Sequence, residues 1–200
     1  LTTMIGPQQS SQAMRQLSIT ATDGASIDLS AVESMDYPVA VSADGTGSTI
    51  DLTSLERVDN HPEYHYNWTE FLVDNHGSVL IPALSTATYA YFKLQGNGTL
   101  ELPSLTSVSA CVFYVYDGMT LSAPLLASYT SSGYYTGSLR AVGAGSRLEF
   151  PALITMVGPQ QSSGINRKIE ITATSGGTLD LSGANSIDGP VAISSGGNGS

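Results

Sequence analysis

The chain of 200 residues is poor in cysteine, tryptophan and basic residues. The single cysteine, Cys111, excludes an internal disulfide and a cysteine-based zinc site, and its apolar neighbours predict a buried, unreactive thiol. Seven lysines and arginines stand against seventeen acidic residues, which gives a net charge of −10. This balance disfavours nucleic acids and anionic membranes as partners, because phosphate groups are bound by clustered cations. No apolar run approaches the ~18 residues of a membrane-spanning helix, so we expect no membrane insertion.

The sequence also lacks any sustained helical periodicity. Glycine, serine, threonine and β-branched residues are abundant instead, which is an all-β composition. Apolar residues alternate with polar ones over three to five positions, as in Phe92-x-Leu94 and Leu100-x-Leu102. This alternation predicts short strands that each bury one face.

A short motif of the type Gly-Thr-Leu-Glu-Leu-Pro-Ser-Leu recurs seven times along the chain. The first apolar residues of its copies are Ile27, Ile50, Val79, Leu100, Leu121, Leu148 and Leu179. Their spacings run from 21 to 31 residues, and a unit of this length that tolerates insertions is typical of a solenoid. Since a unit holds no partner for its own strands, each strand must pair with its equivalent in the next unit.

The sequence therefore predicts an all-β fold, a right-handed parallel β-helix of about seven coils of 21–31 residues. We expect Leu100 to stack between Val79 and Leu121, and four prolines to share one corner of the coils. These prolines are Pro82, Pro103, Pro124 and Pro151. A leucine-rich-repeat horseshoe is the alternative, but its buried Asn or Cys after the strand has no fixed place here.

A longer repeat is superimposed on the short one. Residues 1–48 align with residues 153–200 without a gap, at a constant offset of 152 and with 27 identities. We interpret the chain as one β-solenoid segment, 1–200, in which residues 1–152 form one long block and residues 153–200 begin the next. We expect the chain to be a mature or excised portion of a longer protein.

Four units carry a long link at the same place, after the last inward apolar residue of one unit and before the first strand of the next. These links are Ile5–Gln16, Asp59–Glu70, Thr130–Ser138 and Val157–Lys168. Loops at one position of a solenoid protrude from one edge, so this edge is where we expect binding.

The second of these links contains the candidate metal ligands. His61, Glu63 and His65 alternate, so an extended backbone would place two imidazoles and a carboxylate on one side. Such a set suits a transition metal. The alternative interpretation is a solvated aromatic loop whose histidines bind nothing.

The aromatic residues are concentrated between the third and sixth units. The candidate ligand-binding residues are Tyr64, Tyr66, Trp68, Tyr89, Tyr91, Tyr114, Tyr116, Tyr134 and Tyr135. Stacked coils would bring Tyr91 and Tyr114 to one side. Tyrosine and tryptophan combine an apolar ring with a polar tip, which suits a carbohydrate or a protein partner. Alternatively, the rings only stabilise neighbouring strands.

Acidic residues occupy the outward position between inward apolar residues in five units, namely Asp28, Asp51, Glu101, Glu149 and Asp180. Like charges on adjacent strands repel, and a Ca²⁺ ion with oxygen ligands would relieve the repulsion. Leu80 and Ser122 interrupt this row, so the alternative is a solubilising face that opposes aggregation.

We expect no enzyme activity and no cofactor. Polysaccharide-cleaving β-helices need clustered carboxylates beside a lysine or arginine, and no such group can be assembled from the sequence. The sequence also shows no serine–histidine–aspartate order, phosphate-binding glycine loop or HExxH motif. A polysaccharide lyase or glycoside hydrolase is the catalytic alternative.

The repeated Gly-Thr-Leu-Glu-Leu-Pro-Ser-Leu-Thr-Ser-Val pattern resembles the repeats of large bacterial extracellular β-helix proteins of the adhesin-like and surface-fibre class. The resemblance implies export to the cell surface and a structural or adhesive role as a stalk, filament subunit or adhesin, with no catalytic residues. The expected partners are further copies joined end to end, other surface proteins or a polysaccharide. Asn67, Asn97 and Asn198 would accept N-glycans in a eukaryotic source.

Overall fold

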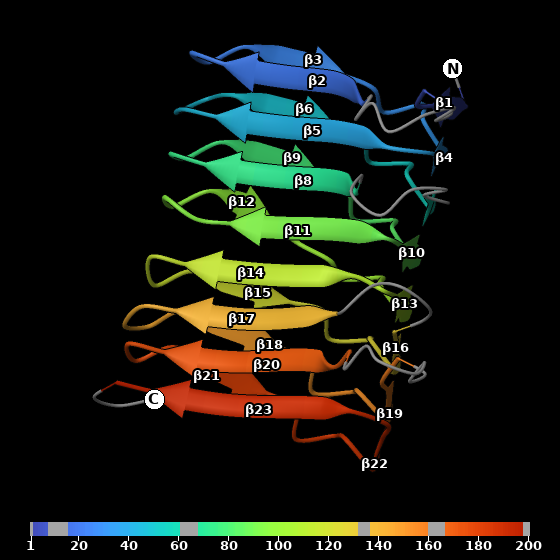
Figure 1. Ribbon diagram of the computed structural model, residues 1–200. Coiled ribbons are helices and arrows are strands. Elements are labelled where there is room, and N and C mark those ends of the chain that lie inside the picture. Colours follow the sequence, from blue (N-terminus) through green and yellow to red (C-terminus); the bar gives the residue numbers. More distant parts are fainter. Residues whose placement is uncertain (1, 8–15, 61–67, 132–136, 160–166, 198–200) are drawn as a thin grey trace.

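A computed structural model describes residues 2–7, 16–60, 68–131, 137–159 and 167–197. These residues form a stack of three-stranded coils without any helix, and thus without a helix that could cross a membrane. All strand pairs among the described residues are parallel and join equivalent strands of neighbouring coils, as predicted, with one interruption between β12 and β15. Figure 1 shows the chain descending from the N-terminus as a right-handed parallel β-helix.

Two sheets of eight strands run through the whole stack. Sheet A has the order β1 (Thr3–Ile5), β4 (Ser34–Asp36), β7 (Arg57–Asp59), β10 (Thr86–Thr88), β13 (Ser107–Ser109), β16 (Ser128–Thr130), β19 (Thr155–Val157) and β22 (Ser186–Asp188). Sheet B has the order β2 (Leu17–Thr22), β5 (Val39–Asp44), β8 (Thr69–Asp74), β11 (Ala90–Leu94), β14 (Val112–Tyr116), β17 (Ser138–Val142), β20 (Ile169–Thr174) and β23 (Val191–Gly196).

The third side of the coil is divided into two sheets. Sheet C has the order β12 (Thr99–Leu100), β9 (Ser78–Leu80), β6 (Thr49–Asp51) and β3 (Ser26–Asp28). Sheet D has the order β15 (Thr120–Ser122), β18 (Arg147–Glu149) and β21 (Thr178–Asp180). Among the described residues, seven complete coils are therefore followed by two strands of an eighth.

The sequence predicts that Leu100 stacks between Val79 and Leu121, and strand pairing confirms only the first of these two neighbours. Leu100 is in register with Val79, but β12 does not pair with β15, so Leu100 and Leu121 are not ladder neighbours. Both leucines are nevertheless buried in the same core. At this break β12 is two residues long, whereas the other strands of sheets C and D have three.

The core consists of columns of inward residues that follow the sheet register. One column of sheet B contains Ile19, Val41, Phe71, Phe92, Phe113, Leu139, Ile171 and Ile193. The ring planes of Phe71 and Phe92 are 6° apart with centroids at 5.2 Å, and those of Phe92 and Phe113 are 15° apart with centroids at 4.9 Å. This alternation of buried and outward residues is the one that the period of two predicts.

The four prolines occupy the same corner of the coil, as expected. At this corner the chain turns from a strand of sheet C or D into the next strand of sheet A. At Pro82 the turn is closed by the Leu84 N–H, which donates to the Ile81 carbonyl at 3.2 Å. The equivalent bond around Pro124 joins the Leu126 N–H to the Ala123 carbonyl at 3.2 Å. Proline costs no ladder bond at this corner because the turn residue does not donate to a neighbouring coil.

The strand bounds repeat at the offset seen in the sequence. Strands β1 to β5 begin and end 152 residues before β19 to β23, for example Leu17–Thr22 and Ile169–Thr174. Inward residues of the outermost coils have no coil beyond them among the described residues. Leu17 is therefore 39% exposed and Ile193 68% exposed, although both occupy core columns.

Candidate functional site

The strands that flank the four long links meet at one edge of the solenoid. Each link joins a strand of sheet A to the next strand of sheet B, for example β7 to β8 and β16 to β17. The common edge predicted for these insertions is therefore confirmed by the strands that flank them. Several candidate residues lie outside the described residues: His61, Glu63, His65, Tyr64, Tyr66, Tyr134 and Tyr135, together with Asn67 and Asn198.

The outward side chains of sheet B bring three of the predicted tyrosines together. In β11 and β14, Phe92, Phe113 and Val115 point into the core, so Tyr91, Tyr114 and Tyr116 point outward. The Tyr91 and Tyr114 rings meet edge to face, with centroids 5.3 Å apart and planes at 88°. The Tyr114 and Tyr116 centroids are 6.3 Å apart with planes at 86°. Edge-to-face contacts of this kind stabilise aromatic pairs and hold the rings in place.

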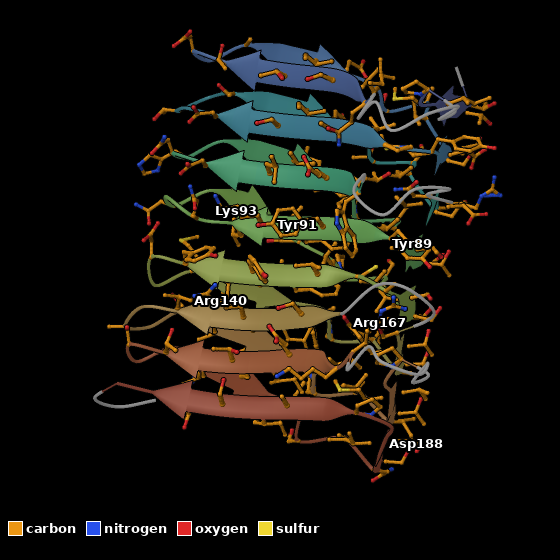
Figure 2. The ribbon with its side chains drawn as sticks, viewed as in Figure 1. Tyr89, Tyr91, Lys93, Arg140, Arg167 and Asp188 are labelled. Atoms are coloured by element: carbon orange, nitrogen blue, oxygen red, sulfur yellow. The ribbon has the colours of Figure 1, made fainter. Side chains whose placement is uncertain are left out.

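Two cations complete this cluster. The Lys93 Nζ lies 5.7 Å from the centroid of the Tyr116 ring, and the Arg140 guanidinium carbon lies 5.9 Å from the centroid of Tyr114. These are cation–π distances. We call Tyr91, Lys93, Tyr114, Tyr116 and Arg140 the aromatic–cationic patch. Figure 2 shows Tyr91, Lys93 and Arg140 on the exposed face of sheet B.

Burial raises the pKa values of two tyrosines in the patch. Burial raises the pKa of Tyr91 far above its ordinary value, and the neighbouring Tyr116 and Tyr114 add to the effect. Burial also raises the pKa of Tyr116, against the opposing effect of Arg140. Both phenols therefore keep their protons and can donate hydrogen bonds at neutral pH. Glu70, opposite Tyr91 on β8, has a pKa raised by burial, which a hydrogen bond from Gln16 partly offsets.

Trp68 and Tyr89 form a second aromatic group at the edge where the long links lie. Their rings are 6.2 Å apart at an angle of 61°, and the Gln16 amide donates to the Trp68 carbonyl at 3.0 Å. Tyr89 has a φ of 49° at the corner that leads into β11, which turns it away from the outward row of sheet B. Figure 2 shows Tyr89 at the end of β11 and Tyr91 near its middle. The predicted aromatic surface is therefore divided into two groups.

Tyr129 does not belong to either group. It is fully buried in the column between Val108 and Met156, and its hydroxyl donates to the Cys111 carbonyl. Burial raises its pKa well above the ordinary value. Gly137 leaves the space that the ring occupies, because a Cβ there would lie 2.8 Å from Tyr129 Cζ.

Cys111 is fully buried, as predicted. Its Sγ donates weakly to the carbonyls of Ala87 and Ser109, each at 3.4 Å. Burial raises the pKa of this thiol to about 12. Because the thiolate is the reactive form, Cys111 is placed as a packing residue rather than as a nucleophile.

The acidic row contains the two adjacent pairs that the sequence predicts. Asp28 is in register with Asp51, and Glu149 with Asp180. The aspartate oxygens close local turns: Asp28 Oδ1, for example, accepts from the Ser30 hydroxyl at 2.6 Å and from the Ser30 N–H at 2.9 Å. These bonds lower the pKa of Asp28. In the described part of the chain, no three His, Cys, Asp or Glu side chains are grouped to hold a metal ion.

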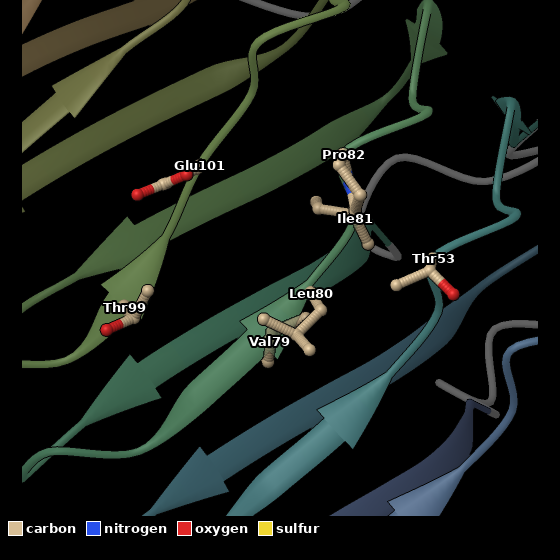
Figure 3. A pocket seen from close by; sticks show the side chains of 7 residues that line it. All are labelled: Thr53, Val79, Leu80, Ile81, Pro82, Thr99 and Glu101. Atoms are coloured by element: carbon tan, nitrogen blue, oxygen red, sulfur yellow. The ribbon is translucent and has the colours of Figure 1, made fainter.

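Two hollows flank β12, where sheets C and D are separated. One, of about 350 Å³, is lined by Thr53, Val79, Leu80, Ile81, Pro82, Thr99 and Glu101 (Figure 3). The other, of about 380 Å³, lies on the far side of β12 and shares Glu101. Glu101 is the one ionisable side chain among the lining residues of either hollow. General acid–base cleavage of a glycosidic bond uses two carboxyl groups, so neither lining supplies that pair.

Sequence reasoning assigned no role to the cations of the patch, although a signal for them was present. Phe92 and Leu94 are inward, so the residues between and beside them, Tyr91 and Lys93, must share the outer face. Arg140 lies between inward Leu139 and Ala141 in the same way. Their closeness to the tyrosine rings also depends on the register of β11, β14 and β17, which the alternation does not reveal.

Comparison with known proteins found no matching family model, curated protein or solved structure.

Proposed function

We propose that this chain is a non-catalytic structural and adhesive segment of a long extracellular repeat protein, of the adhesin-like or surface-fibre class. The observation that carries this proposal is the pair of parallel eight-stranded sheets wound around one continuous core. Hydrogen bonds between coils run along the solenoid axis, so tension or bending along the axis must break many of them together. A stiff spacer with contact residues on its sides is the role that suits this architecture.

Assembly end to end is the mechanism we propose for a filament. The outermost strands β2 and β23 each have one edge without a neighbouring strand among the described residues. Inward apolar side chains are exposed at both ends, with Leu17 at 39%, Ile187 at 46% and Ile193 at 68%. A further coil, supplied by a second copy of this chain or by a continuation of it, would cover these side chains and extend the ladders.

We expect Ile193→Lys to prevent this assembly, because a lysine would place a charge in the end-to-end contact. Analytical ultracentrifugation over a range of concentrations should show wild-type oligomers that grow with concentration, and a monomeric variant. Ile154→Lys is the matched control: Ile154 is 49% exposed but lies directly before β19, on the side of the solenoid. Negative-stain electron microscopy would show the oligomers as unbranched rods. A wild-type chain that stays monomeric throughout would contradict the filament role.

Carbohydrate binding is the second candidate function, favoured by the half-buried, outward-facing rings of the patch. Tyr91, Tyr114 and Tyr116 offer apolar ring faces and edges next to hydroxyl donors, and such surfaces suit sugar rings. Trp68 is the only tryptophan, and it lies at the edge of the same sheet. Its fluorescence is therefore a specific reporter of ligands on this side.

We expect a saturable change of Trp68 fluorescence when the chain is titrated with a polysaccharide that binds this face. The panel should include neutral dextran and acidic polygalacturonate. N-acetyltryptophanamide, titrated in the same way, controls for absorption and for non-specific quenching. A chain whose emission responds to none of the polysaccharides would argue against the carbohydrate-binding function and leave the structural role untouched.

A further inference from the structure

We propose that the aromatic–cationic patch binds an acidic polysaccharide, with a sugar ring on Tyr114 and acid groups on Lys93 and Arg140. This inference rests on the carbohydrate-binding function and specifies its ligand class. The patch is formed by β11, β14 and β17, near the middle of the solenoid.

Charge is the first argument. The chain carries −10 overall, yet the patch contributes two positive charges. Three other cations pair with carboxylates: Arg57 with Asp36 at 3.5 Å, Arg147 with Glu149 at 3.9 Å and Lys168 with Glu170 at 3.7 Å. Among the described residues, Lys93 and Arg140 have no carboxylate within that range and lie over tyrosine rings instead. Their charges are therefore available to an anionic ligand.

Register is the second argument. Lys93 is directly opposite Tyr114, and Tyr114 is directly opposite Arg140. A cation, a ring and a cation thus follow one another on three successive strands, and the two cations are separated by two strand spacings, or about 10 Å. A polysaccharide lying along the solenoid axis could place one sugar on the central ring and acid groups on both sides. A neutral glycan would contact only the tyrosine ring. A polyanion that has no sugar rings would contact only the two cations.

Neighbouring charges set the limits of the site. Glu70 lies on β8 opposite Tyr91, and Glu170 lies on β20 opposite Ser138, on the strand that follows that of Arg140. Both carboxylates would repel an acidic polysaccharide, so the surface that can bind one is confined to β11, β14 and β17. Within it, the protonated hydroxyls of Tyr91 and Tyr116 can donate hydrogen bonds to sugar oxygens.

The test compares two doubly substituted chains that lose the same charge. Lys93→Gln/Arg140→Gln removes both patch cations, whereas Arg57→Gln/Arg147→Gln removes two cations on other sheets. Isothermal titration calorimetry with polygalacturonate should show affinity reduced about tenfold or more in the patch variant, and nearly unchanged in the control. Tyr114→Val, which keeps a strand-forming side chain, should weaken binding similarly because it removes the ring. Comparing the affinity for dextran sulfate with that for polygalacturonate shows whether the patch prefers sulfate or carboxylate groups.

The remaining probes separate the ways in which the proposal could fail. Equal affinity for neutral dextran would overturn the acidic preference while leaving carbohydrate binding in place. Equal affinity for poly-glutamate would show that the patch recognises charge without a sugar ring, as a protein partner could. Unchanged polygalacturonate binding in both Lys93→Gln/Arg140→Gln and Tyr114→Val would place the carbohydrate site elsewhere. If polygalacturonate and dextran both fail to bind wild type, this inference and the carbohydrate-binding function fall together.

Discussion

Replacing Phe92 with alanine is expected to lower the free energy of unfolding by about 3–5 kcal/mol, the usual cost of deleting a buried ring. Phe92 is completely buried and lies between Phe71 and Phe113, with ring centroids 5.2 and 4.9 Å away. An alanine would leave a cavity in the middle of this stack. Both neighbouring rings belong to sheet B strands fixed by pairing on either side, so they cannot close the gap.

Urea denaturation followed by far-ultraviolet circular dichroism would measure this loss. Phe92→Leu should cost less, up to about 1.5 kcal/mol, because most of the buried volume is kept. Ile19→Ala provides a positional control, since Ile19 occupies the same column in the outermost coil and is only partly buried. It should cost less than Phe92→Ala. Equal losses at the two positions would mean that the phenylalanine stack adds nothing beyond ordinary coil packing.

Replacing Gly77 with alanine is expected to destabilise the fold by about 1–3 kcal/mol, because it forces two coils apart. A Cβ on Gly77 would overlap the Ala43 carbonyl oxygen in the coil before it and would lie 2.6 Å from the carbonyl carbon. This obstacle is backbone, which cannot rotate away as a side chain can. Gly77 is not in the left-handed region, so the strain comes from lack of space rather than from its own φ.

Gly196→Ala is the matched control for Gly77→Ala. The nearest heavy atom to a Cβ at Gly196 is Thr174 Cγ2 at 4.0 Å, an ordinary contact. We expect the midpoint of thermal unfolding of Gly196→Ala to stay close to that of the wild type, while the midpoint of Gly77→Ala falls. If both variants melt like the wild type, the coils at Gly77 can separate without loss of the ladders. The close approach would then not be a constraint on the coil spacing.

The candidate site was predictable only in part. Alternation places Tyr91, Tyr114 and Tyr116 outward, and the repeat places them in neighbouring coils, so their meeting could be predicted. The burial of Tyr129 in the core could not be predicted from the sequence in the same way. It belongs to β16, the sheet A strand of its coil, whose short polar–apolar–polar pattern around a single inward residue resembles a surface link.

The pairing of rings with cations needed the register between coils. Lys93 lies over Tyr116, which is one coil further on and not directly opposite it. Trp68 and Tyr89 also come together across coils, and the left-handed backbone at Tyr89 separates them from the outward row. Such contacts depend on side-chain direction and corner geometry, which a pattern of apolar residues does not contain.

The amino-acid sequence by itself determined the solenoid, its coil length and which residues of the alternating strands of sheets B, C and D face the core. These properties follow from local rules, because strand periodicity is two and each unit can only pair with its neighbour. The tertiary structure alone decided where a ladder stops, as between β12 and β15, and which outward side chains touch. Those outcomes depend on the register and spacing of whole coils packed around a shared core, and no single unit contains that information.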